Sequence, residues 1–403
     1  MLTRHRLTFA TLCTGHFVND LYSSVIFPLL PLIKLKLGLT TAQIFWLAPI
    51  YAVSSSLMQP VYGLLSDRYA RRSFAVFGPA ITATFVSLIG LAPSYAALMA
   101  VLVAGGVGIG SFHPQAATMA SVASGERRRV GMALFSASGT LGYALGPLSI
   151  ALIVGAFGLD KTYYILGPGL LMSAVMYRVC PPLEEPASPA GGGHVKWRLL
   201  SSLHAAWKPL LLLYLITVIR SGLQMTTNNY LPFLLREQGY DVTGTGGVIT
   251  VFLLLGGLGG IAGGFMAERM SGRAVTLYSG LLAGPLMMAA FLTPGVAGIV
   301  LLALGGFMLL STIPVIVAMA QELVPGQTST VSALMMGAAW GIGALAPPVL
   351  DTLVPALGFR TVLVLASATT PVSAALAYFL PRDERSARKI REAEMATAAP
   401  AGD

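Results

Sequence analysis

The chain contains two copies of one charged motif, and their spacing limits the folds that it can adopt. The first copy, GLLSDRYARR, begins at Gly63, and a weaker copy, GFMAERMSGR, begins at Gly264, 201 positions later. Each copy ends one strongly apolar stretch and precedes the next. Each motif therefore predicts a charged loop where a helix leaves a membrane, and the repeat predicts two halves of similar structure.

Other landmarks recur at nearly the same spacing. Five pairs of residues stand 200 or 201 positions apart: Pro31 and Pro232, Ser111 and Ser311, Pro114 and Pro314, Gly142 and Gly343, and Pro147 and Pro348. A single short motif can recur by chance, but several landmarks in one register do not. The two halves are therefore expected to share an origin.

The composition indicates an all-α integral membrane protein. Hydrophobic residues make up 55% of the chain and charged residues 10%, whereas soluble domains are about 25% charged. A membrane-spanning helix needs about 20 apolar residues. We predict twelve such helices, six in each half, over residues 8–32, 43–65, 73–92, 95–120, 131–157, 162–180, 207–235, 246–267, 274–292, 295–320, 328–354 and 360–380.

The distribution of basic residues predicts the orientation. If the N-terminus lies inside, 19 Lys and Arg residues fall on the inner side and five on the outer side, and only Arg220 lies within a helix. Basic residues favour the cytoplasmic side. We expect a multi-pass protein of the bacterial inner membrane with both termini in the cytoplasm, and we attribute the net charge of +9 to this topology and not to nucleic-acid binding.

The polar interruptions divide the chain into four parts. We predict an N-terminal six-helix bundle over residues 1–180, a cytoplasmic linker over 181–206, a C-terminal six-helix bundle over 207–382 and a cytoplasmic tail over 383–403. Cys13 and Cys180 offer neither a disulfide framework nor a metal-ligand spacing. The glycine run near Gly257 lacks the strand that a dinucleotide site needs. We expect a monomer without metal or cofactor.

With these two halves, the whole chain resembles the major facilitator superfamily, whose loop motif is Gly-x-Leu-x-Asp-Arg-x-Gly-Arg-Arg. The first copy matches it except that Ala70 replaces the internal glycine, and Glu268 replaces the aspartate in the second copy. The resemblance implies alternating access, with these motifs and a glycine-proline motif in helix 5 controlling the switch between states. The residues concerned are Gly63, Asp67, Arg68, Arg71, Arg72, Glu268, Arg269, Gly142, Gly146 and Pro147.

Within that superfamily, three stretches of the first half resemble the fosmidomycin resistance protein group of drug exporters. They begin at Gly15 (GHFVND), Ser54 (SSSLMQP) and Gly110 (GSFHP). The sequence GYALGP from Gly142 is similar to the core of the antiporter motif of major facilitator exporters, although the glycine pair that usually follows is absent. The resemblance implies export, and the departure leaves the direction open.

Charged residues inside the membrane cost about 2.5 to 3.5 kcal/mol each, so each needs a partner or a task. We predict that Asp20 carries protons, with His16 on the same helical face and His113 beside a helix break as further candidates. Arg220 is expected to hold an anionic substrate group through bidentate hydrogen bonds. The alternatives remain that Asp20 is a static partner of Arg220 and that both histidines are structural.

Neutral polar and aromatic residues in helices 1, 2, 4, 5 and 7 predict a polar central chamber, although interhelical packing is an alternative for each. The candidates for this substrate cavity are Asn19, Tyr22, Gln59, Gln115, Tyr143, Gln224 and Asn228.

These patterns favour a secondary active transporter that exports a small drug-like or anionic compound in exchange for protons. A proton-coupled importer of a sugar or carboxylate is the alternative, and a membrane sensor or scaffold without turnover is a remote one. An enzyme is disfavoured because the chain has no zinc-ligand spacing, nucleophile elbow or phosphate loop.

Overall fold

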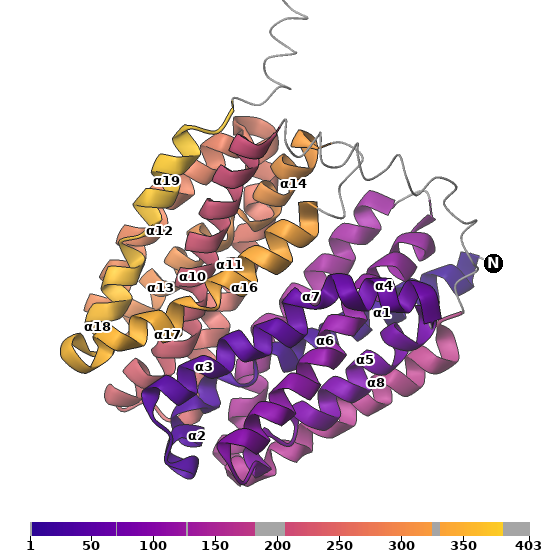
Figure 1. Ribbon diagram of the computed structural model, residues 1–403, viewed down its shortest axis with the longest axis horizontal. Coiled ribbons are helices and arrows are strands. Elements are labelled where there is room, and N and C mark those ends of the chain that lie inside the picture. The colour runs from indigo at the N-terminus through magenta and orange to yellow at the C-terminus, as the bar shows by residue number, and fades with distance from the viewer. Residues whose placement is uncertain (1, 70, 126–127, 182–205, 325–330, 382–403) are drawn as a thin grey trace, which may run out of the picture.

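The computed structural model describes residues 2–69, 71–125, 128–181, 206–324 and 331–381, and within them all regular structure is helical (Figure 1). The predicted linker and C-terminal tail lie almost wholly outside the described residues. The N-terminal half contains α1 (Leu2–Ser24), η1 (Phe27–Leu29), α2 (Leu30–Leu37), α3 (Thr41–Ala52), η2 (Val53–Leu57), α4 (Gln59–Tyr69), α5 (Arg71–Val86), η3 (Ile89–Leu91), α6 (Tyr95–Ala123), α7 (Arg128–Phe157), η5 (Leu159–Ile165) and α8 (Leu166–Val179).

The C-terminal half is built in the same way. It contains α10 (Trp207–Glu237), α11 (Val242–Met270), α12 (Gly272–Leu292), α13 (Gly295–Leu310), α14 (Ile313–Leu323), η6 (Ala333–Ala338), α16 (Ala339–Gly343), α17 (Ala346–Leu350), η7 (Asp351–Leu353), α18 (Val354–Ser367) and α19 (Thr370–Tyr378). The segments η2 and η6 are π-helices, which are rare and are frequently found at functional sites.

Ten stretches of the described residues are long and apolar enough to cross a membrane, and they account for eleven of the twelve predicted segments. The last stretch, Leu334–Tyr378, is 45 residues long and covers two segments. A straight helix of that length would be more than twice as long as the bilayer is thick. The chain instead bends at Gly358, whose φ of 74° is left-handed. The remaining segment, 162–180, corresponds to η5 and the short helix α8.

Several helices begin at a polar residue whose side chain accepts a hydrogen bond from the backbone of the first turn. Thr40 and Gln43 form a capping box at α3, and Asp241 accepts a hydrogen bond from the Gly244 backbone at α11. Proline shapes the helix interiors. Pro147 has no backbone N–H and so frees the Tyr143 carbonyl one turn earlier, which accepts a hydrogen bond of 2.5 Å from Ser24.

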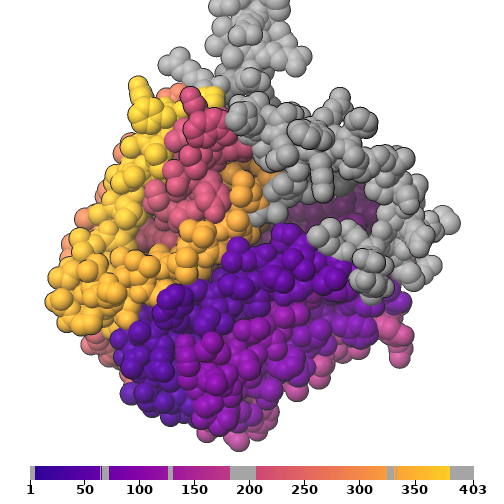
Figure 2. All heavy atoms as spheres, viewed as in Figure 1, coloured from indigo at the N-terminus to yellow at the C-terminus, as the bar shows by residue number. Residues whose placement is uncertain are grey.

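The two halves pack together most tightly at one end, which we call the closed end. There Phe45 of α3 lies 4.4 Å from Tyr230 and 5.6 Å from Phe233 of α10, and Phe359 of α18 stacks on Phe233 at 5.1 Å (ring centroids). We call these four residues the aromatic cluster. Asp351 accepts a hydrogen bond from Thr41 across the same interface. Figure 2 shows a continuous surface where α3 meets α17 and α18.

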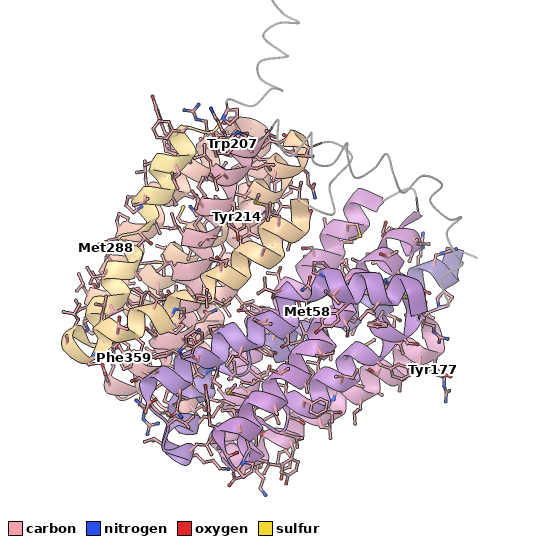
Figure 3. The ribbon with its side chains drawn as sticks, in the orientation of Figure 1. Met58, Tyr177, Trp207, Tyr214, Met288 and Phe359 are labelled. Atoms are coloured by element: carbon pink, nitrogen blue, oxygen red, sulfur yellow. The ribbon has the colours of Figure 1, made fainter. Side chains whose placement is uncertain are left out.

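From the closed end the halves separate (Figure 1). Figure 3 shows this through its labelled residues: Phe359 lies at the closed end, while Trp207 and Tyr177 lie at the far, divergent ends of the two halves. The contact between α11 and α7 is likewise close near the closed end and is lost farther along α11. A Cβ on Gly246 would lie 2.7 Å from the Pro147 carbonyl oxygen and one on Gly257 would lie 2.8 Å from Thr140, but one on Gly264 would meet nothing within 4 Å.

Candidate functional site

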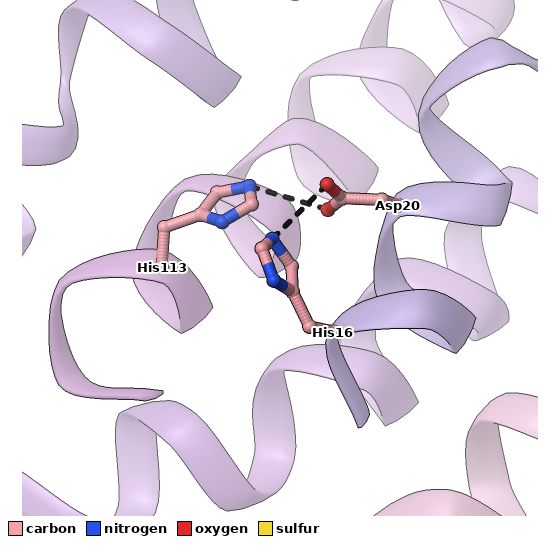
Figure 4. Close-up of side chains that lie close together, drawn as sticks. All are labelled: His16, Asp20 and His113. Atoms are coloured by element: carbon pink, nitrogen blue, oxygen red, sulfur yellow. Dashed lines mark ion pairs between the residues drawn. The ribbon is translucent and has the colours of Figure 1, made fainter. Parts of the chain in front are cut away.

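Three titratable side chains meet inside the N-terminal half (Figure 4). His16 Nε2 lies 3.2 Å from Asp20 Oδ2 on the same helix, and His113 Nε2 of α6 lies 3.3 Å from Asp20 Oδ1. The first contact follows from the spacing of four residues on α1, and the second from the packing of α6 against α1. The carboxylate therefore lies between two imidazoles, and we call these three residues the Asp20 cluster.

The backbone around His16 fixes which of its nitrogens carries hydrogen. His16 Nδ1 lies 2.7 Å from the Phe135 carbonyl oxygen, and the ring stacks on Phe135 at 4.2 Å. A carbonyl only accepts hydrogen bonds, so Nδ1 must donate. A hydrogen bond between Nε2 and Asp20 then needs one more proton, on either the imidazole or the carboxyl group. The pair is built to hold that proton.

Gly139 of α7 lets the third helix approach the Asp20 cluster. A Cβ at this position would lie 2.7 Å from Asp20 Oδ2 and would clash with the His16 ring. The cluster is largely enclosed, yet 15% of the Asp20 side chain and 24% of the His113 side chain are exposed. The surrounding helices therefore enclose the Asp20 cluster without sealing it completely.

Two tyrosines complete the electrostatic surroundings of the Asp20 cluster. The phenol groups of Tyr51 of α3 and Tyr143 of α7 lie near Asp20. The ligand atoms of His16, Asp20 and His113 lie within 4.8 Å of one another, a spacing that a divalent metal ion would also accept. The two direct contacts provide Asp20 with protein partners.

Arg220 lies in the C-terminal half and is 4% exposed. Its Nε donates to the Leu309 carbonyl at 3.1 Å, and Nη2 donates to the carbonyls of Met308 at 2.9 Å and Leu309 at 2.8 Å and to Ser279 Oγ at 3.1 Å. Among the described residues, no ion pair joins Arg220 to Asp20. The two charged residues therefore have separate partners, each within its own half.

A small cavity lies beside Arg220. It is lined by residues of α10, by the break between α13 and α14, and by η6 and α16, and its volume is about 20 Å³. Thr312, Gln224 and Trp340 are among the lining residues. This volume is enough for about one water-sized group.

The other residues predicted to line the cavity differ in whether their contacts join the two halves or stay within one. Asn228 donates to the Tyr143 hydroxyl at 3.3 Å, which joins the two halves. Asn19 accepts from Thr82 at 3.1 Å, and Gln59 donates to the Ser55 carbonyl, one turn earlier. Gln115 is 3% exposed.

Tyr22 has a packing position instead. It is 1% exposed, and its hydroxyl donates to the Ile165 carbonyl and accepts from the Gly169 N–H at 3.1 Å. These bonds attach α1 to η5 and α8 within the core of the N-terminal half. The sequence could not distinguish a tyrosine that faces a chamber from one that binds a neighbouring helix.

The residues predicted to control switching fall into three groups. The side chains of Asp67, Arg68 and Arg71 lie outside the described residues. Arg72 donates to the Tyr177 carbonyl and lies 5.0 Å from the centre of the Tyr177 ring, within its own half. Glu268 and Arg269 are exposed.

The glycines of the predicted switch occupy tight contacts. Side chains at Gly142 and Gly146 would clash with the backbone of Phe17 and Leu21, so both positions hold α7 against α1. A Cβ at Gly63 would approach Pro114 to 3.7 Å. Among these switch residues, Pro147 lies where α7 contacts the other half. Its carbonyl oxygen lies against Gly246 of α11, and the next backbone N–H, of Leu148, donates to Thr250 of α11 at 3.1 Å.

The sequence interpretation missed several residues of these sites. Gly139 and Phe135 border the Asp20 cluster, and Ser279 and Thr312 border Arg220. Small and weakly polar residues are common throughout the chain, so the sequence carried no signal for these positions. Asp351 was visible as an acid within the predicted segment 328–354, and a search for acids in apolar stretches would have found it.

Comparison with known proteins agrees with this architecture. The sequence model of the Major Facilitator Superfamily matches residues 12–345 and 213–402. An uncharacterized MFS-type transporter of Bacillus subtilis strain 168, YfnC, is 30% identical over 94% of this chain and 92% of its own length. The fosmidomycin resistance protein of Escherichia coli strain K12 is 27% identical over 94% of this chain and 94% of its own.

Among solved structures, a bacterial homologue of the human lysosomal transporter Spinster superposes with a TM-score of 0.79 at 16% identity, over 94% of this chain and 97% of its own. This likeness supports the fold. Together with the family match over most of the chain, it shows that the protein belongs to the major facilitator superfamily of multi-pass membrane transporters, which are not enzymes.

Proposed function

We propose that this protein exports a small drug-like or anionic compound in exchange for protons, by alternating access. The observation that carries the proposal is the Asp20 cluster. His16 already donates from Nδ1 to a carbonyl, so its contact with Asp20 requires a proton that can be gained and lost. Loss of that proton sets the Nε2 lone pair against a carboxylate and destabilises the arrangement.

The shape of the molecule, closed at one end and open at the other, supports alternating access. If the basic residues lie in the cytoplasm, the closed end with the aromatic cluster faces outward, and the halves separate toward the cytoplasm. In that orientation this is an inward-open state. A compound and a proton would each enter or leave from the cytoplasm until the halves close on that side and the aromatic cluster opens.

The direction of transport is the part of the proposal that rests on the relatives. One relative is named for fosmidomycin resistance, and multi-drug resistance efflux pumps match 40% of this chain at 25% identity. The Asp20 cluster itself serves a symporter equally well. Reversing the pH gradient in the same vesicles therefore gives the decisive comparison.

The experiment uses purified protein in proteoliposomes and follows fosmidomycin and a panel of amphipathic compounds. For an exchanger, a pH gradient should drive each substrate toward the more acidic side. Accumulation on the alkaline side, along with protons, would replace export by import. Transport unaffected by a pH gradient of either sign, for every compound transported, would reject proton coupling.

A further inference from the structure

The environment of Arg220 is unusual for a buried cation. Four of its hydrogen bonds go to neutral groups, the Leu309 and Met308 carbonyls and the Ser279 hydroxyl. No carboxylate pairs with it among the described residues, and Nη1 has no hydrogen-bond partner there. Guanidinium groups stay protonated in proteins. A full positive charge is therefore buried without an opposite charge.

The break between α13 and α14 explains how this cation is held. Ser311 and Thr312 separate the two helices, and Pro314 cannot donate a backbone hydrogen bond. The last carbonyls of α13 are left to accept from Arg220, at the negative end of that helix. These contacts orient the guanidinium, but carbonyl dipoles do not neutralise its charge.

Two residues with unused donors line the same small cavity. Arg220 and Thr312 both line it, and Thr312 Oγ1, like Arg220 Nη1, is buried without a partner among the described residues. Two residues that each have a free donor, one of them charged, thus border a space for about one oxygen-sized group. Met336, also in the lining, is 52% exposed and marks the mouth of the cavity.

The helical segment that holds Met336 contacts the other half of the molecule. Met336 belongs to the π-helix η6, and a Cβ on the next residue, Gly337, would lie 3.4 Å from the Ser56 carbonyl oxygen of η2. A molecule bound between the halves can therefore insert one group into the cavity while the remainder stays outside. Trp340, Met335 and Gln224 form walls for the part next to that group.

We propose that this cavity is the subsite for an oxyanion group of the transported compound, such as a carboxylate, sulfonate or phosphonate. This subsite would define the substrate class of the transport proposed above, and the inference rests on that proposed function. Because Nε and Nη2 are already used by the protein, the anion binds end-on to Nη1 with help from Thr312, and not across the guanidinium fork that the sequence suggested. The Arg220 subsite thus selects a single protruding oxygen.

Equilibrium binding to the full-length purified protein in detergent tests this subsite without any transport. The probes are methylphosphonate and its neutral dimethyl ester, and the readouts are calorimetry and the fluorescence of Trp340. Wild-type protein should bind the anion and not the ester. Thr312→Val should weaken anion binding about tenfold or more, the effect of one lost hydrogen bond to a charged group.

Arg220→Gln should abolish anion binding, and Arg220→Lys should retain part of it because the charge remains. The matched control is Arg236→Gln, since Arg236 is exposed at the end of α10. Thermal unfolding checks that each variant is folded, and Thr312→Val provides the test if Arg220 variants do not fold. Equal binding of the anion to wild-type and Thr312→Val protein, or equal binding of anion and ester, overturns the subsite.

The two proposals fail separately. Asp20→Asn should bind methylphosphonate as the wild type does, because Asp20 has no contact with Arg220. Anion binding with no pH-driven flux contradicts proton coupling and leaves the subsite in place. Flux driven by a pH gradient, with no effect of Thr312→Val or Arg220→Lys on anion binding, contradicts the subsite alone.

Discussion

At the level of single residues, the proposed mechanism depends on polar side chains that helix packing brings into contact. Asp20 contacts two histidines, and the proton between Asp20 and His16 follows from the Phe135 carbonyl, which fixes the other ring nitrogen. Arg220 has the opposite character, because its hydrogen-bond partners among the described residues are all neutral. One half of the molecule thus holds a carboxylate between two histidines, and the other holds a cation with no described counter-charge.

Gly139→Ala tests how closely the Asp20 cluster is packed. The new methyl group would clash with the His16 ring and Asp20, and an overpacked site typically costs about 1 to 3 kcal/mol. We expect pH-driven flux to fall about 5-fold to more than 100-fold. The control is Gly167→Ala, since a Cβ on Gly167 meets nothing within 4 Å. Similar flux in both variants would show that the cluster is not tightly packed.

The sequence predicted Asp20, His16 and His113 as candidates because ionisable residues are rare in apolar helices. It placed His16 on the same helical face as Asp20, but it did not predict that His113 joins them, since that contact depends on how α6 packs against α1. It also left open a pairing of Asp20 with Arg220, because both stand near the middle of corresponding helices. Only the three-dimensional arrangement shows that the described partners of each lie in its own half.

At the scale of elements, small residues and helix breaks decide which helices approach. Gly142 and Gly146 bring α7 to α1, whereas Gly246 and Gly257 bring α11 to α7 in the other half. The apolar pattern predicted where helices run, because length and hydropathy determine membrane insertion. It could not predict the π-helices η2 and η6 or the short helices after Ala339, which are local adjustments to proline, glycine and tertiary packing.

Phe45→Ala tests whether the aromatic cluster holds the closed end shut. Phe45 is fully buried and contacts three aromatic rings of the other half, so its loss removes contacts made only while this end is shut. Removal of a buried phenyl ring costs about 3 to 5 kcal/mol, enough to move a two-state equilibrium substantially. We expect longer distances between spin labels placed at Ala42 and Ala356.

The matched control for this change is Trp46→Ala. Trp46 is the next residue on α3 but is 48% exposed, so it should contribute little to the closed end. Its label distances should stay those of the wild type, measured in protein whose two native cysteines are replaced. An unchanged distance in Phe45→Ala would mean that the aromatic cluster does not hold this end shut.

At the level of the whole molecule, two helical halves separate toward one side and meet at the other (Figure 1). The repeat in the sequence predicted two such halves. The sequence could not predict which end is shut, because both states of a transporter share one sequence and differ only in the contacts between halves.

The proposed orientation can be tested in intact cells. A cysteine replacing Gly193, in the predicted linker, should be protected from a membrane-impermeant thiol reagent added outside, because the distribution of basic residues predicts a cytoplasmic linker. It should react once the membrane is opened. Labelling of intact cells would reverse the orientation, and with it the interpretation of the structure as inward-open.

We propose that Asp20 carries the coupled proton, and the flux of Asp20→Asn protein in proteoliposomes provides a direct test. The amide resembles the protonated acid in size and hydrogen bonding but cannot release a proton. We predict that pH-driven transport is lost while exchange of substrate across the membrane at equal pH remains, and that the control Asp160→Asn keeps both, since Asp160 lies at the surface with Lys36. Full pH-driven flux in Asp20→Asn would contradict the account.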